Sequence, residues 1–179
     1  MKLVILDRDG VINYDSSDYI KNAEEWVPIP GSLESIARLN KNGFKVVIAS
    51  NQAGIGKGLY DMAALNGINE KISITLKALG GHIDKFFYCP HTDLDKCDCR
   101  KPKAGLLNQI NEYYNVSLKD IPAVGDSQRD LLAFDKVQAQ PILVKTGNGE
   151  QTILSNQYPK NTWIFNNLSD AIDEILKHY

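Results

Sequence analysis

The sequence of 179 residues lacks several features, and each absence argues against a class of protein. No apolar segment approaches the length of a membrane span, and the first residues have neither the apolar stretch nor the cleavage site of a signal peptide. The formal net charge is only −2, so no overall positive charge attracts nucleic acid or an anionic membrane surface. We therefore expect a cytoplasmic protein that binds neither nucleic acid nor membranes.

Internal repeats, low-complexity tracts and linker-like stretches are also missing, and 43% of the residues are hydrophobic. This length and composition allow one sizeable core, so we expect a single domain over residues 1–179.

Short apolar runs alternate with helical patterns along the chain. This alternation predicts an α/β fold: a Rossmann-like, three-layer domain with a central parallel sheet. The expected helices begin at Gly31-Ser32, at Asp61 and at Ser169, each a candidate N-terminal cap. The expected strands are the apolar run before residue 7 and residues 45–49, 86–88, 121–124, 142–144 and 162–165.

The first apolar run ends in two carboxylates, Asp7 and Asp9, followed by Gly10. Parallel sheets bind ligands beyond the carboxyl ends of their strands, so both side chains should stand at the rim of a site. Two carboxylates this close resist joint ionisation unless a cation lies between them. The pair therefore predicts a Mg²⁺ site with one aspartate free to react.

A later run, 121–124, ends in Gly125 and a third carboxylate, Asp126. Its position at another strand end makes Asp126 a natural metal ligand. Asp130 follows on the next expected helix, where it either orients a lysine or the metal shell, or caps that helix.

All three cysteines and one of the three histidines lie between residues 89 and 99, as Cys89, His91, Cys97 and Cys99. Three thiols and one imidazole form a tetrahedral Zn²⁺ set. The alternative is a disulfide, but it would leave one thiol unpaired, and neighbouring C-x-C thiols bridge poorly. Because protein would fill all four positions, this zinc should staple a loop and take no part in chemistry.

Three cations follow the last cysteine directly: Arg100, Lys101 and Lys103. Such a run is commonly a solvated surface. Here the zinc would fix its position, and an acidic site needs cations to bind an anionic substrate.

The sequence resembles the haloacid dehalogenase superfamily of aspartate-nucleophile phosphatases in four features. These are Asp-x-Asp-Gly at 7–10, Ser50 after the second strand, Lys101, and Gly-Asp-x-x-x-Asp at 125–130. The cysteine and histidine stretch is similar to its zinc-bearing branch, which holds histidinol-phosphate phosphatases and heptose bisphosphate phosphatases. The segments at 7–13, 19–21, 25–34, 50–58 and 124–131 favour the heptose enzymes, whose reaction feeds lipopolysaccharide core synthesis. Lys57, Ala104 and Leu106 depart from the pattern, with arginine, proline and methionine the usual residues.

The resemblance implies a role for each motif residue. Asp7 is the nucleophile and Asp9 the acid and base, while Ser50 and Lys101 bind the phosphoryl group in transfer. Mg²⁺ is held by Asp7, the backbone carbonyl of Asp9, and Asp126. The positions that match the family's substrate contacts are the segment from Asp15 to Tyr19, together with Asn51, Gln52, Ala53, Lys57, Arg100 and Ser127.

The short gaps between motifs leave no room for an inserted cap domain, so we expect an open site walled by loops 11–30 and 51–60 and by the zinc loop. A small phosphorylated sugar is the expected substrate and a monomer the expected state.

Three alternatives stay open at this point. A histidinol-phosphate phosphatase shares the catalytic set. A DNA 3′-phosphatase needs a basic stripe with stacking aromatics, which is not visible. A signalling receiver module needs a phosphoryl group that stays on its aspartate. Asp9 argues against this alternative, because a carboxylate two residues after the nucleophile promotes turnover.

Overall fold

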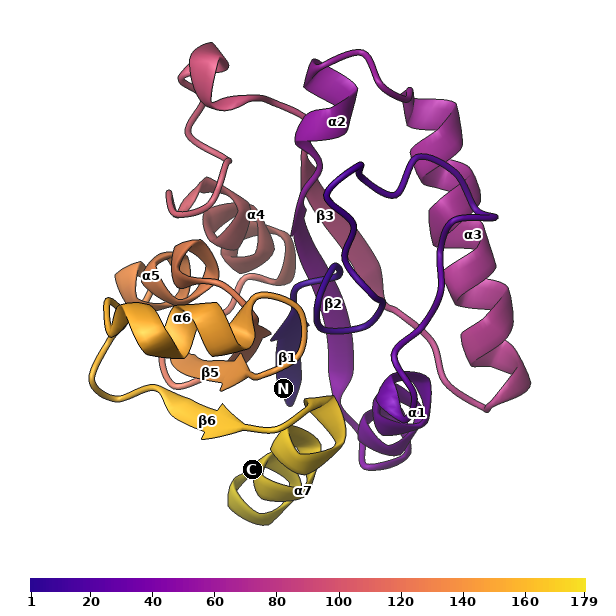
Figure 1. Cartoon of the computed structure of the whole chain (residues 1–179). Helices are drawn as coiled ribbons and strands as arrows, with labels where there is room; N and C mark the ends of the chain where they lie inside the picture. Colours follow the sequence, from indigo (N-terminus) through magenta and orange to yellow (C-terminus); the bar gives the residue numbers. More distant parts are fainter.

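The computed structural model describes residues 1–179 and contains a six-stranded sheet in the order β3-β2-β1-β4-β5-β6, in which every pairing is parallel (Figure 1). The strands are β1 (Leu3–Leu6), β2 (Lys45–Asn51), β3 (Lys85–Cys89), β4 (Pro122–Gly125), β5 (Gln140–Val144) and β6 (Trp163–Phe165). The α/β class and the parallel sheet are thus confirmed.

The helices are α1 (Ser32–Lys41), α2 (Ala53–Gly56), α3 (Met62–Ala78), α4 (Gly105–Tyr114), α5 (Gln128–Lys136), α6 (Gly149–Ser155) and α7 (Leu168–His178), with a short 3₁₀ helix η1 (Asp93–Asp95). None of them is both long and apolar enough to cross a membrane.

Alternate residues of β1 belong to two separate apolar cores, one on each face of the sheet. Val4 and Leu6 pack with residues of α1, α3 and α7, whereas Leu3 and Ile5 pack with residues of α4 and α5. Figure 1 shows these two helix layers on opposite sides of the strands. Burial on both faces explains why the strands read as unbroken apolar runs and not as alternating ones.

The long helix α3 begins as the sequence predicts. The Asp61 carboxylate accepts a hydrogen bond from the Ala64 N–H at 2.9 Å, which caps the first turn. Its apolar residues at helical spacing, Leu65, Ile68, Ile72 and Leu76, are all buried.

One of the expected helix caps is wrong. The cap of α7 is Asn167, whose side chain accepts from the Asp170 N–H at 3.0 Å, and Ser169 lies inside the helix. Asparagine and serine both cap helices well, so residue type alone does not distinguish these two positions. At α1 the N-cap is Gly31, as expected, and the hydroxyl of Ser32 in the first turn donates to the carbonyl of Val11 at 3.0 Å.

The loop between β1 and α1 contains no regular helix or strand, and only α2 and α3 lie between β2 and β3. No domain is inserted at either position. The carboxyl ends of β1, β2 and β4 are therefore left without a cap domain.

Candidate active site

Three buried carboxylates meet beyond the carboxyl ends of the central strands. Asp7 follows β1, Asp126 follows β4, and Asp130 lies in the first turn of α5. One carboxylate oxygen from each lies within 4.8 Å of the others. The paired order of β1 and β4 brings together residues that are far apart in the sequence, and parallel strands place their ends at one edge.

Burial and mutual repulsion favour protonation of two of these groups. Burial, followed by the charge of Asp130, raises the pKa of Asp7 to about 7. Burial and the charges of Asp130 and Asp7 raise the pKa of Asp126 to about 8. A cation between them would reverse this, so the cluster is suited to binding one.

Lys101 is the buried cation nearest to this cluster. Its Nζ lies 2.9 Å from Oδ1 of Asp7 and 2.7 Å from Oδ1 of Asp130, and it donates to the Ala49 carbonyl at 2.7 Å. Burial lowers the pKa of Lys101, but the charges of Asp130 and Asp7 outweigh it and raise that pKa above its usual value. The ammonium is therefore fixed in direction and remains charged.

Asp130 combines both of the roles that the sequence left open. Its Oδ2 accepts from the backbone N–H of Ser127 at 3.1 Å and from the Ser127 hydroxyl at 2.6 Å, which makes a capping box, while Oδ1 faces Lys101. Burial raises the pKa of Asp130, but the charges of Lys101 and Arg129 outweigh burial and lower it. One carboxylate thus starts α5 and also anchors the lysine.

Two glycines allow the backbone to approach Asp126 closely. Gly10 has φ +81°, and a Cβ there would lie 2.0 Å from Oδ2 of Asp126, while a Cβ on Gly147 would lie 2.2 Å from the same atom. No side chain fits at either position. The same oxygen accepts from the backbone N–H of Asn148 at 2.8 Å and from its Nδ2 at 3.1 Å.

Asp9 is turned toward Arg8, a buried residue. Arg8 donates from Nε at 2.9 Å and from Nη2 at 3.1 Å to the two carboxylate oxygens, and Asn13 donates to Oδ1 at 2.9 Å. Burial raises the pKa of Asp9, but the charge and hydrogen bonds of Arg8 outweigh burial and lower it. The backbone carbonyl oxygen of Asp9 accepts no hydrogen bond, which leaves it available to a metal ion.

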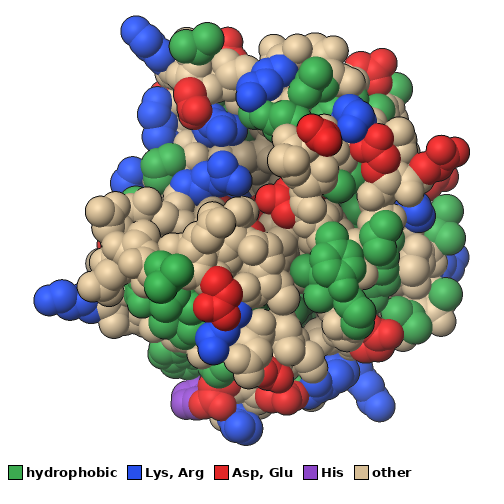
Figure 2. Space-filling view, viewed as in Figure 1, with side chains coloured by type: hydrophobic (Ala, Val, Ile, Leu, Met, Phe, Trp, Pro, Cys, Tyr) green, Lys and Arg blue, Asp and Glu red, His purple; other side chains and the backbone are tan.

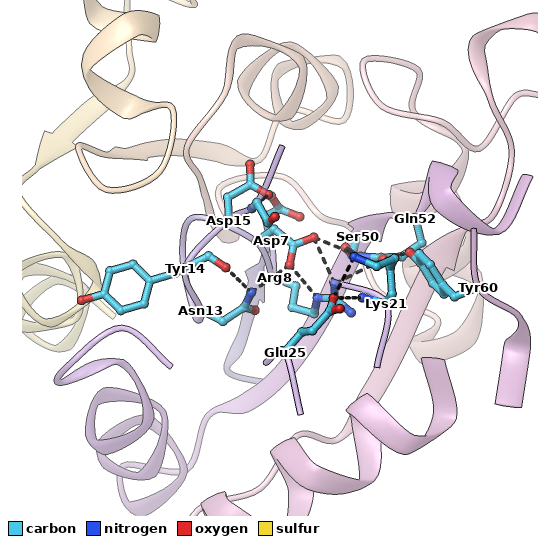
Figure 3. Close-up of polar contacts among 12 residues, drawn as sticks. Asp7, Arg8, Asn13, Tyr14, Asp15, Lys21, Glu25, Ser50, Gln52 and Tyr60 are labelled. Atoms are coloured by element: carbon cyan, nitrogen blue, oxygen red, sulfur yellow. Dashed lines mark hydrogen bonds and ion pairs between the residues drawn. The ribbon is translucent and has the colours of Figure 1, made fainter. Parts of the chain in front are cut away.

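The side chain of Gln52 links Ser50, Asp9 and Arg8 by hydrogen bonds. Its Nε2 donates to Ser50 Oγ at 2.7 Å and to Asp9 at 3.2 Å, and its carbonyl oxygen accepts from Arg8 at 3.3 Å and from the Tyr60 hydroxyl (Figure 3). Gln52 and Ser50 are both buried, and together with Arg8 they line a small cavity. Sequence reasoning did not identify Tyr60 as part of this network.

A cavity of about 290 Å³ opens above Asp7, and Figure 2 shows the face on which acidic side chains lie beside basic ones. Its lining includes Asp7, Asp9, Asp15, Ser16, Ser17, Tyr19, Asn51, Lys101, Arg129 and Asn148.

Only some of the predicted contact residues line this cavity: Asp15, Tyr19 and Asn51 do, whereas Gln52, Ala53, Lys57, Arg100 and Ser127 do not. The side-chain amide of Asn51 donates to the Lys101 carbonyl at 3.0 Å, and its oxygen accepts from the Lys101 N–H at the same distance. Lys57 donates to the Tyr19 hydroxyl at 2.5 Å. Ala53 is buried at the start of α2. Arg100, Lys101 and Lys103 line a neighbouring recess on the loop that follows η1.

Cys89, His91, Cys97 and Cys99 converge as the sequence predicts. Cys89 Sγ lies 3.0 Å from Cys99 Sγ and 3.6 Å from Cys97 Sγ, and His91 Nδ1 lies 3.3 Å from Cys99 Sγ. All three cysteines are free thiols, so there is no disulfide. Sulfur ligands of one tetrahedral zinc ion are about 3.8 Å apart, given Zn–S bonds of about 2.3 Å, so this set fits zinc with small adjustments.

Comparison with known proteins places this geometry in a family. A family model described as polynucleotide kinase 3 phosphatase matches residues 2–139. The D-glycero-β-D-manno-heptose-1,7-bisphosphate 7-phosphatase of Pseudomonas putida is 49% identical over 176 residues, which are 98% of this chain and 100% of that one. The chain belongs to the heptose-1,7-bisphosphate 7-phosphatase family.

Solved structures of heptose bisphosphate phosphatases are similar throughout. The enzyme from B. bronchiseptica, complexed with magnesium and phosphate, has a TM-score of 0.98 and 44% identity, and each chain is covered over 100% of its length. The enzyme from Burkholderia thailandensis has a TM-score of 0.78 and 41% identity, with 98% of this chain and 99% of that one covered. The resemblance to the haloacid dehalogenase superfamily is thereby confirmed.

Two pocket residues escaped sequence reasoning. Asn148 belongs to a Gly-Asn-Gly turn after β5, and only the position of β5 beside β4 brings it to Asp126. Arg129 lies in the segment 124–131 that carries part of the resemblance, but the resemblance implied no role for it. For Asn148 the Gly-Asn-Gly turn was the only available signal, and by itself it indicates no ligand.

Proposed function

We propose that the protein removes the 7-phosphate of D-glycero-D-manno-heptose 1,7-bisphosphate and leaves heptose 1-phosphate. The observation that carries this proposal is the match over the full chain to the B. bronchiseptica heptose bisphosphate phosphatase that binds magnesium and phosphate. The pocket agrees with it, because Asp7, Asp9 and Lys101 face one polar cavity that no domain covers.

Asp7 is the proposed nucleophile. Its carboxylate oxygen attacks phosphorus, an aspartyl-phosphate forms, and the bond from phosphorus to the sugar oxygen breaks. Asp7, Asp126 and the free backbone carbonyl of Asp9 would hold Mg²⁺, which when bound supplies positive charge against the phosphate oxygens. Asp130 does not join this set, because it is committed to Lys101 and Ser127.

Lys101 and Ser50 are proposed to donate to the phosphoryl group in transfer. Lys101 already lies 2.9 Å from the nucleophile, which supports its role. Ser50 Oγ accepts from Gln52, so its own hydroxyl hydrogen is free for a phosphate oxygen.

Asp9 is proposed to give a proton to the departing sugar oxygen and then to take one from the water that hydrolyses the aspartyl-phosphate. The ion pair with Arg8 keeps Asp9 ionised, which suits the second step. The first step needs a protonated Asp9, so this ion pair must open before the sugar leaves.

The substrate contacts are proposed to come from the walls of the cavity and its rim: Asp15, Tyr19, Asn51, Gln52, Ala53, Lys57, Arg100 and Ser127. Arg100 supports this best, since its Nη1 is buried and has no hydrogen-bond partner within the protein. Gln52 is directed toward Asp9 and Ser50 and not toward the cavity, so its proposed contribution is to position those residues.

Zn²⁺ is proposed to bind Cys89, His91, Cys97 and Cys99 and to fix the loop that carries Arg100 and Lys101. The four converging ligand atoms support this assignment. We also propose that the protein acts as a single-domain monomer in the cytoplasm, where a reducing environment keeps such thiols free for a metal.

Histidinol phosphate is the competing substrate, and the matches to heptose bisphosphate phosphatases do not favour it. Steady-state kinetics with Mg²⁺ on both substrates tests the proposal. We expect kcat/KM to be far higher for the heptose bisphosphate. A preference for histidinol phosphate would instead support the second assignment.

A further inference from the structure

We infer that Arg129 binds the phosphate group of the substrate that is not transferred, because it is the free cation on the wall of the cavity above Asp7. This inference rests on the proposed function, since only a substrate with two phosphates offers such a group. It assigns a specificity-determining role to a residue outside the expected contact set.

The cavity contains two cations, Lys101 and Arg129, against the carboxylates of Asp7, Asp9 and Asp15. Lys101 is already committed to Asp7 and Asp130. Arg129 is exposed and its guanidinium makes no hydrogen bond or ion pair with the protein. A second phosphate that enters this cavity therefore meets one unengaged positive group.

The other candidate cations each already have a partner within the protein through one nitrogen atom. Arg100 donates from Nε to Asp93 at 2.6 Å, and Lys57 donates to the Tyr19 hydroxyl. Either would have to exchange a partner to bind phosphate with that atom. Arg129 loses no protein contact, and its planar fork can bind two phosphate oxygens at once.

The backbone at Arg129 is held in place by the capping box that begins α5. Ser127 and Asp130, one on each side of it, bond to each other through backbone and side chain. A fixed first turn limits the positions that the guanidinium can reach, which favours a specific contact over general attraction.

The test compares kcat/KM on heptose 1,7-bisphosphate with kcat/KM on heptose 7-phosphate, which lacks the second phosphate. A hydrogen-bonded charge contact is worth roughly 10- to 100-fold. For Arg129→Ala and Arg129→Gln we therefore expect kcat/KM to fall by about that factor on the bisphosphate and by less than about threefold on the monophosphate. Arg129→Lys should recover part of the loss, because lysine keeps the charge without the fork.

Arg38→Ala is the matched control, because Arg38 is an arginine whose partner, Asp173, lies on α7, and neither residue lines the cavity. It should leave both values unchanged. Inhibition by heptose 1-phosphate gives a second readout: this product retains the group in question, so its inhibition constant should rise in Arg129→Ala by a similar factor.

An equal loss on both substrates, or no loss on either, would overturn the inference while leaving the proposed function intact. Failure of the wild-type protein to hydrolyse the bisphosphate would overturn the proposed function, and this inference with it. A variant that does not fold is recognised by its thermal unfolding, and Arg129→Lys then decides the result: a loss of kcat/KM that is larger on the bisphosphate than on the monophosphate supports the contact, and an equal loss on both substrates, or no loss on either, refutes it.

Discussion

Asp130→Asn separates the two contacts of one buried carboxylate. The amide can still accept the hydrogen bonds from Ser127 that cap α5, but it has no charge to pair with Lys101, whose Nζ is 2.7 Å from Oδ1 of Asp130. Asp130 is fully buried and its pKa is lowered, so the substitution removes an ionised group at neutral pH.

The expected loss of stability follows from the burial of the pair. Removing one partner of a buried ion pair destabilises by about 3–5 kcal/mol. We expect the lower value, about 3 kcal/mol, because Lys101 keeps its contact with Asp7 and because one of three mutually repelling carboxylates loses its charge. At about 2–4 °C per kcal/mol for a chain of this size, the midpoint should fall by about 6–12 °C. Turnover should fall by about tenfold or more, since Lys101 loses an anchor.

Thermal unfolding at pH 7 with Mg²⁺ measures this effect, together with kcat on the preferred substrate. Ser127→Ala is the control, because it removes the hydroxyl that bonds Asp130 and leaves the ion pair intact. It should lower stability by only about 1 kcal/mol. If Asp130→Asn is no more destabilising than Ser127→Ala and keeps full turnover, the buried ion pair neither stabilises the fold nor positions Lys101 for turnover.

Three further predictions concern the nucleophile and the metals. Asp7→Asn should abolish turnover and leave the fold intact, since it keeps the shape and removes a buried charge; a variant with a tenth of wild-type activity would contradict the assignment. In the metal-free protein the pKa values of Asp7 and Asp126 are raised to about 7 and about 8, so the folded state retains protons that the unfolded chain releases. The contribution of these two groups to the free energy of unfolding therefore falls as pH rises from about 4 to about 8. Because protons compete with the metal for these carboxylates, Mg²⁺ should raise the unfolding midpoint more at pH 8 than at pH 6. The reverse order would be inconsistent with a metal site at these carboxylates. Elemental analysis should find one zinc per chain that survives a chelation sufficient to remove Mg²⁺, and Cys97→Ser should lose it; active protein purified without zinc would refute the proposed staple.

Much of the fold could be predicted because its strands are buried on both faces. An apolar run such as Leu3–Leu6 that ends in Asp7 indicates a central parallel strand and a site beyond its end. The convergence of Cys89 with Cys97 and Cys99 was predictable from ligand chemistry, because three thiols and one imidazole within eleven residues match the donor set of a structural zinc site.

Other parts of the site depend on contacts between distant segments, which no local pattern encodes. Asn148 reaches Asp126 only because β5 lies beside β4. The position of Arg8 beside Asp9 depends on Gln52, which follows β2 and accepts both from Arg8 and from the Tyr60 hydroxyl. The cap of α7 was ambiguous for a different reason, because Asn167 and Ser169 are both residue types that cap helices well.

Regiochemistry is the most direct test of the central claim. Phosphorus NMR can follow the reaction of purified protein, Mg²⁺ and heptose 1,7-bisphosphate. We predict that the signal of the 7-phosphate disappears as inorganic phosphate forms and that heptose 1-phosphate is the sole sugar product. Accumulation of heptose 7-phosphate, or of free heptose at the same rate, would contradict the account.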